Sequence, residues 1–165
     1  MADLTPIERL QPCLLDRLTD DEPLVQEESR NQRVISLQKY RRGVLRDLEW
    51  LFNAHGYLHL GKEAFDIKDY PEACRSVINF GIAQLCGVTT PDMERLQVDL
   101  GEAIRRFEPR ITPRGLTIHA DRERNLIMFE VEGDLWANPL PEHLHLKSTV
   151  DIETGQCTFG DSNHG

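Results

Sequence analysis

Apolar side chains recur at every third or fourth position along the N-terminal part of the chain, which is the spacing of helices with one buried face. The clearest run predicts a helix from about Val34 to Phe52, with a stop near Gly56, where glycine can take a positive φ. Gly43 lies inside this helix and costs about 1 kcal/mol relative to alanine. We therefore interpret Gly43 as the point of a close helix crossing or a backbone contact.

Two shorter apolar runs predict further helices. One begins at Tyr70-Pro71 and continues through Cys74, Val77, Ile78 and Phe80 until Gly81 bends or ends it. The other lies in an acidic stretch and predicts a small docking helix or a partly disordered lead, built on Leu10, Leu14, Leu15 and Leu18. The resulting organisation is an N-terminal acidic arm over residues 1–30 and a single domain over residues 31–165.

Another strong helix leads into a charged bend of the chain. Thr90 is expected to be its N-cap, with Pro91 in the first turn, and Pro109 should stop the helix at Glu108. Arg110 follows directly, so two opposite charges are fixed at the point where a helix ends and the sheet begins. We call Glu108, Pro109 and Arg110 the charged corner.

Three interpretations of the charged corner remain open from the sequence: a partner contact, a structural salt bridge, or a catalytic acid. A glycoside hydrolase needs a second carboxylate, for which Asp99, Glu102 and Glu130 are candidates. Arg110 would favour the ionised form of Glu108, which is the wrong direction for a general acid. We therefore expect no enzymatic activity and no catalytic residue, with peptidoglycan hydrolysis by Glu108 as the alternative function.

After Arg110 the period of the apolar pattern changes from helical spacing to alternation, the mark of half-buried strands. Alternating segments cover Leu116–Ala120, Ile127–Glu132 and His143–Asp151, and a short fourth segment ends near Phe159. The fold class predicted is α+β, with N-terminal helices packed on a small antiparallel β-sheet formed by the C-terminal third.

Charge excludes some classes of partner. The net charge of −9 argues against nonspecific nucleic-acid binding. The acids of residues 1–30 face a basic run made of Arg33, Lys39, Arg41, Arg42 and Arg46. These two stretches either attract each other as solvated faces, or Arg42 and Arg46 form a basic helix face kept for an acidic partner.

Other signals in the sequence are weak. No apolar stretch approaches the roughly 18 residues of a membrane span, and the N-terminus lacks a signal-peptide pattern, so we expect a cytoplasmic protein without direct membrane insertion. His143 and His145 point to the same side of a strand, but neither HExxH nor CxxC supplies further ligands, so no metal site and no cofactor are predicted. The scattered cysteines are expected to be reduced and buried or inert: Cys13, Cys74, Cys86 and Cys157.

Four short motifs, in this order, point to a family. They are LLDRL at 14–18, VLRDLEWLFN at 44–53, SVINFG at 76–81 and IRRFEPRI at 104–111. Together they resemble the TssE family, baseplate subunits of the bacterial type VI secretion system within the lysozyme-like wedge family of contractile phage-tail baseplates. The resemblance covers nearly the whole chain up to about Phe159.

The resemblance implies a structural subunit rather than an enzyme. TssE-like proteins join the TssF and TssG wedge subunits, at a baseplate docked on the inner face of the cytoplasmic membrane, and present a strand surface to the first sheath ring of TssB and TssC. The family's assembly motif falls on the charged corner. We expect the sheath-facing edge within Leu116–Asp151, and the partner-binding residues are predicted to be Glu108, Pro109, Arg110, Arg42 and Arg46.

Overall fold

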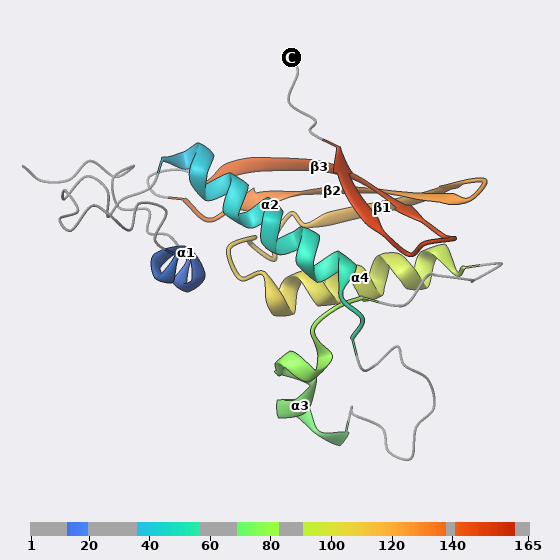
Figure 1. Ribbon diagram of the computed structural model, residues 1–165, viewed down its shortest axis with the longest axis horizontal. Coiled ribbons are helices and arrows are strands. Elements are labelled where there is room, and N and C mark those ends of the chain that lie inside the picture. Colours follow the sequence, from blue (N-terminus) through green and yellow to red (C-terminus); the bar gives the residue numbers. More distant parts are fainter. Residues whose placement is uncertain (1–12, 20–35, 57–68, 83–90, 138–140, 161–165) are drawn as a thin grey trace, which may run out of the picture.

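A four-stranded antiparallel sheet covered on one face by helices forms the body of the protein (Figure 1). A computed structural model describes residues 13–19, 36–56, 69–82, 91–137 and 141–160. The strand order is β1-β2-β3-β4, so each strand pairs with its neighbour in sequence. The predicted α+β class, with helices first and an antiparallel sheet after, is confirmed.

The helices and strands have well-defined bounds. The helical elements are α1 (Leu14–Leu18), α2 (Leu37–Asn53), α3 (Pro71–Arg75), the 3-10 turn η5 (Val77–Asn79) and α4 (Met93–Phe107). The strands are β1 (Thr117–Glu123), β2 (Leu126–Leu135), β3 (Glu142–Asp151) and β4 (Cys157–Gly160). No described helix has both the length and the apolar character that a membrane crossing requires.

The hydrophobic core lies between the sheet and the two long helices. β2 and β3 alternate buried and more exposed residues along their length, with Phe129 and Leu144 among the fully buried side chains. α2 contributes Leu48 and α4 contributes Ile104, both fully buried. Each such side chain stabilises the fold by about 1.5–3 kcal/mol relative to exposure. The apolar stripes predicted for the two long helices are therefore their core-facing sides.

The predicted helix after Tyr70 is interrupted, which corrects the sequence interpretation. α3 ends at Arg75, and Ser76 takes an extended backbone while its hydroxyl accepts from the Ile78 N–H at 3.3 Å. A serine that offers a local acceptor competes with the helical hydrogen bond. Val77 and Ile78 are consequently exposed in the 3-10 turn rather than buried on a helix face.

The start of α4 also differs from the prediction. Asp92, not Thr90, is the N-cap, and its carboxylate accepts from the Arg95 N–H at 3.0 Å. Pro91 therefore precedes the helix instead of occupying its first turn, and Thr90 lies outside the described residues. Aspartate is as good an N-cap as threonine and places its charge at the positive end of the helix.

Gly56 serves close packing rather than a left-handed helix cap. α2 ends at Asn53 with Ala54 as an extended C-cap, and Gly56 is not among the glycines with positive φ. A Cβ at Gly56 would lie 3.0 Å from the Asn79 carbonyl oxygen, and the Gly56 N–H donates to Ile82 O at 3.3 Å. A larger residue would crowd the two backbone segments that approach each other at this point.

The described cysteines are free thiols. Cys157 is buried in the core, and burial raises the pKa of its thiol to about 12. Cys13 and Cys74 are half-buried, and Cys86 lies outside the described residues.

Candidate functional site at the charged corner

The charged corner is fixed to both the helix that precedes it and the sheet that follows. Glu108 is the C-cap of α4, and its N–H donates to Ile104 O at 2.8 Å. Beyond the bend, Trp136 N–H donates to Arg110 O at 2.7 Å, and Thr112 N–H donates to Asp134 O at 2.8 Å. These hydrogen bonds tie the corner to the end of β2, so its side chains are presented from a rigid backbone.

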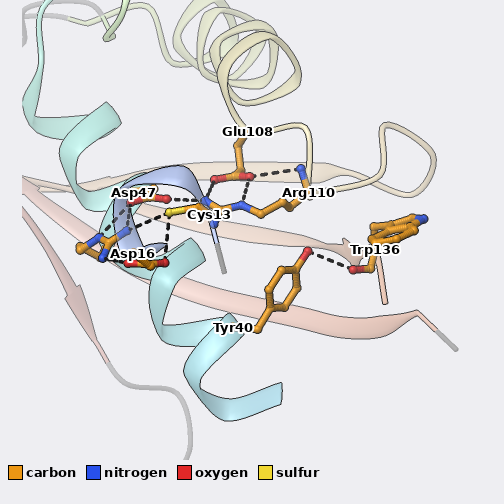
Figure 2. A network of polar contacts seen from close by, with 8 residues as sticks. Cys13, Asp16, Tyr40, Asp47, Glu108, Arg110 and Trp136 are labelled. Carbon is orange, nitrogen blue, oxygen red and sulfur yellow. Dashed lines mark hydrogen bonds and ion pairs between the residues drawn. The ribbon is translucent and has the colours of Figure 1, made fainter. Parts of the chain in front are cut away.

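Glu108 and Arg110 pair with each other inside the protein. The Glu108 Oε1 atom accepts from the Arg110 backbone N–H at 3.1 Å and from its Nε at 2.6 Å, and Oε2 pairs with a terminal guanidinium nitrogen. The same guanidinium donates to Asp47 Oδ2 on α2 at 2.6 Å (Figure 2). Glu108 is only 3% exposed, so this pair is a buried bridge from the corner to α2.

The bridge continues across α2 to α1. Arg46 donates to Asp47 Oδ1 at 2.8 and 2.9 Å, and also pairs with Asp16 of α1. The Cys13 thiol donates to Asp16 Oδ2 at 3.0 Å (Figure 2). We call Glu108, Arg110, Asp47, Arg46 and Asp16 the charge network; its acids and arginines alternate in space.

Burial and charge shift the pKa values of Arg110 and Asp16 in opposite directions, and the effect of charge is the larger one. Burial alone would lower the pKa of Arg110, but its contacts with Glu108 and Asp47 raise it overall. Burial would likewise raise the pKa of Asp16, whereas the hydrogen bond and charge of Arg46 lower it overall. The charged forms of both groups are therefore favoured in the folded protein.

Gly43 on α2 lies next to two members of the charge network, Asp16 and Arg110. A Cβ at this residue would lie 3.3 Å from Asp16 Oδ2 and 3.9 Å from Arg110 Nη1. The glycine therefore leaves room for the Asp16 carboxylate to approach α2; its close neighbours are charged side chains rather than the backbone of a crossing helix.

This geometry favours the structural salt bridge among the three interpretations of Glu108. Both of its carboxylate oxygens are occupied by Arg110, whereas a general acid needs a proton and a free approach for substrate. The candidate second carboxylates have other partners: Asp99 pairs with Arg95, Glu102 with Arg106 and Glu130 with His145. Within the described part of the chain, the structure brings none of the three to Glu108.

The other predicted partner-binding residues differ in their surroundings. Arg46 is engaged by Asp16, which realises one contact between the acidic arm and the basic helix. Arg42 is exposed on α2, and Pro109 is exposed at the bend. Binding of a partner by these residues stays a prediction.

Sequence reasoning did not identify the residues that complete the site. Asp47 was visible only as the acid that ends a basic run, and nothing in the sequence paired it with Arg110.

Tyr40 donates its hydroxyl proton to Trp136 O at 3.0 Å, which holds the end of β2 against α2 (Figure 2). The Trp136 side chain is nevertheless 60% exposed beside the corner. An exposed tryptophan on a rigid backbone is typical of an interface anchor.

Within the described residues the sheet ends at β1 on one side and at β4 on the other, and the backbone groups of the two edge strands are not equally occupied. On β4, the Asn53 side chain of α2 takes both backbone groups of Cys157, accepting from its N–H at 2.8 Å and donating to its carbonyl at 3.1 Å. β1 is longer, and Gln97 reaches its Ala120 carbonyl only at 3.5 Å. Of the strands within Leu116–Asp151, where the sheath-facing edge was expected, β1 is the one at an edge.

Backbone alternation identifies the outward-facing groups of β1. Glu123 and Leu126 flank the two-residue turn and form a hydrogen-bonded pair across it. Because hydrogen-bonded and non-hydrogen-bonded pairs alternate along an antiparallel ladder, the N–H groups that point toward β2 are those of Glu123, Asp121, His119 and Thr117. The intervening N–H groups, on Ile118, Ala120 and Arg122, point outward. The Arg122 N–H accordingly donates to the Asp121 carboxylate at 2.7 Å. Among the described residues the N–H groups of Ile118 and Ala120 have no such partner, and unpaired edge groups of this kind can act as a template for an added strand.

Comparison with known proteins gives one family. The model of a family described as baseplate wedge protein gp25 matches residues 38–140, which is more than half of the chain. The match includes all of α2 but its first residue, together with α4, the charged corner, β1 and β2. No curated protein matches the chain.

Proposed function

The chain belongs to the family of baseplate wedge protein gp25 and so has a structural role in a baseplate; from this premise we propose that it is the TssE-type wedge subunit of a type VI secretion system. In this proposal it joins the TssF and TssG wedge subunits and starts polymerisation of the TssB and TssC sheath. The observation that supports it most is the charged corner, which is built as a rigid bridge beside an exposed tryptophan.

The wedge contact is assigned to the exposed side of the charged corner. Glu108 and Arg110 shape the bend from within, while Pro109 and Trp136 are exposed on its surface. A buried ion pair fixes geometry more than it adds net stability. A rigid bend with an aromatic anchor at its rim fits a partner that must be held in one orientation. Arg42 supplies a cation on α2 for an acidic surface of the partner.

The sheath contact is assigned to the edge of β1. An extended segment of a sheath subunit would add as a further strand and use the outward backbone groups of Ile118 and Ala120. β4 is the poorer edge because Asn53 already occupies the backbone groups of Cys157.

Affinity purification of the tagged chain from its own host, followed by mass spectrometry, tests the wedge assignment. We expect wedge and sheath subunits with the wild type, and loss of the wedge subunits with Trp136→Ala. Val98→Ala is the control, because Val98 is also an exposed apolar residue, at 56%, but lies on α4 and is not a member of the charge network.

Three results are distinguishable. Recovery of no baseplate component by the wild type would contradict the proposed function as a whole. Full recovery with Trp136→Ala would contradict only the assignment of the wedge contact to the corner. Equal loss with Val98→Ala would show that the effect does not belong to the corner.

A further inference from the structure

The outer face of the sheet, opposite the helices, carries a group of metal-ligand side chains that neither the charged corner nor the proposed strand edge uses. Glu130 and Glu132 lie on β2 and His145 lies on β3, with one ligand atom of each within 4.8 Å of the others. The strand register places His145 directly opposite Glu132. The sequence alone showed no further ligands near His145, but strand pairing places Glu130 and Glu132 beside it.

Distances within the group suit a small tetrahedral ion. His145 Nε2 lies 2.6 Å from Glu130 Oε1 and 3.8 Å from Glu132 Oε1. Zinc bonds to nitrogen and oxygen of about 2.0–2.2 Å put neighbouring ligand atoms about 3.3 Å apart. The two observed separations lie on either side of that value, so the side chains would have to rotate to hold an ion.

The next strand carries a histidine on the same face of the sheet, outside the three residues whose ligand atoms already lie close together. His119 on β1 is opposite Glu130 in the register, so the two side chains share the outer face. Directly opposed residues of an antiparallel pair have Cβ atoms about 4.5–5.5 Å apart, within reach of an imidazole and a carboxylate that share an ion. His119 is exposed and so has room to turn toward the group.

We propose that Glu130, Glu132 and His145, with His119 as the fourth ligand, form a zinc-binding site that joins β1, β2 and β3 across the outer face of the sheet. Two carboxylates balance the charge of a divalent ion, and imidazole nitrogen selects zinc over magnesium, which prefers oxygen ligands and retains its waters. The proposal does not depend on the proposed function.

Lys147 competes for the same carboxylate. Its Nζ lies 3.1 Å from Glu130 Oε1, so zinc would have to displace the ammonium group. The Lys147 side chain is 63% exposed and long enough to move into solvent. Replacing this lysine by alanine should therefore strengthen zinc binding.

Titration calorimetry of the untagged full chain with zinc chloride tests the site. We expect binding of one ion, weakened at least tenfold by His145→Ala and by Glu132→Gln, weakened less by His119→Ala and strengthened by Lys147→Ala. His143→Ala is the matched control: His143 lies on the same face of β3, beside Asp134 at 3.4 Å, and its loss should leave the affinity unchanged. A tenfold excess of magnesium chloride should not compete.

Two further measurements keep the outcome unambiguous. Cobalt chloride should give a spectrum without a thiolate charge-transfer band, because the cysteines are not ligands in this proposal. Zinc should raise the melting temperature of the wild type but not that of His145→Ala, whose metal-free melting should match the wild type. The proposal is overturned by a lack of saturable zinc binding, by undiminished binding in His145→Ala, or by a thiolate band.

Discussion

Glu108 combines burial with charge at a position where the backbone has no freedom to relax. Its carboxylate is 3% exposed and is satisfied by three donors of Arg110, while Arg110 in turn reaches Asp47. Removing Glu108 leaves the largely buried Arg110 guanidinium with Asp47 alone, and losing one partner of a buried pair costs more than the net contribution of the intact pair. Glu108, which the family resemblance assigns to an assembly motif, therefore determines the shape of the corner.

Glu108→Ala should lower the free energy of unfolding by about 3 kcal/mol, because the Arg110 guanidinium would lose its principal buried partner. Urea denaturation followed by circular dichroism measures this change. Glu102→Ala is the control on the same helix: Glu102 is 57% exposed and lies 4.0 Å from Arg106, so its loss should cost less than about 0.5 kcal/mol. Equal stability of the two variants would show that the buried bridge is not structural.

At the scale of elements, local signals in the sequence predicted the long helices and the strands, but they did not predict the contacts between segments that are distant in the sequence. The stripe around Leu48, the stop before Pro109 and the alternation around Phe129 each follow from neighbours within one element. The break at Ser76 could not be predicted from periodicity, because it depends on a side-chain hydrogen bond that competes with the helix.

The attachment of α1 to α2 is the contact between elements that depends most on charge. Leu14 and Leu18 of α1 are 71% and 74% exposed, so apolar burial of these residues does not hold the helix in place. Asp16 and Arg46 form its main polar link to the body, and the pKa of Asp16 is lowered overall. The link therefore contributes above the ordinary titration range of a carboxyl group and is lost as the pH falls through the lowered folded-state pKa.

Arg46→Ala should release α1, whereas Arg42→Ala should not. Both arginines lie on α2, but Arg42 is exposed while Arg46 pairs with Asp16 and Asp47. Amide hydrogen exchange of residues 14–18 at neutral pH should accelerate up to about fivefold in Arg46→Ala, since a half-exposed ion pair contributes less than about 1 kcal/mol. Unchanged exchange in Arg46→Ala, or equal acceleration in Arg42→Ala, would contradict this role of the pair.

At the scale of the whole molecule, the sequence predicted the layer arrangement and the corner but not the partners inside it. Glu108, Pro109 and Arg110 are adjacent in sequence, so their bend was predictable; Asp47 and Asp16 come from other elements and meet Arg110 and Arg46 only after folding. The free edge was likewise invisible, because it depends on which strand lies outermost and on Asn53 occupying β4. The result is a body with a fixed corner at one place and an open strand, β1, at another.

The most direct test of the central claim is assembly of the sheath in the host, followed by fluorescence microscopy of a labelled sheath subunit, with Ala120→Pro in β1. Proline removes the outward N–H of Ala120 but no hydrogen bond to β2, so the variant should stay folded and still recover the wedge subunits. Ala120→Val keeps the N–H and is the matched control. We predict that sheath assembly is lost with Ala120→Pro and retained with Ala120→Val; normal sheaths with a folded Ala120→Pro protein would contradict docking of the sheath on β1.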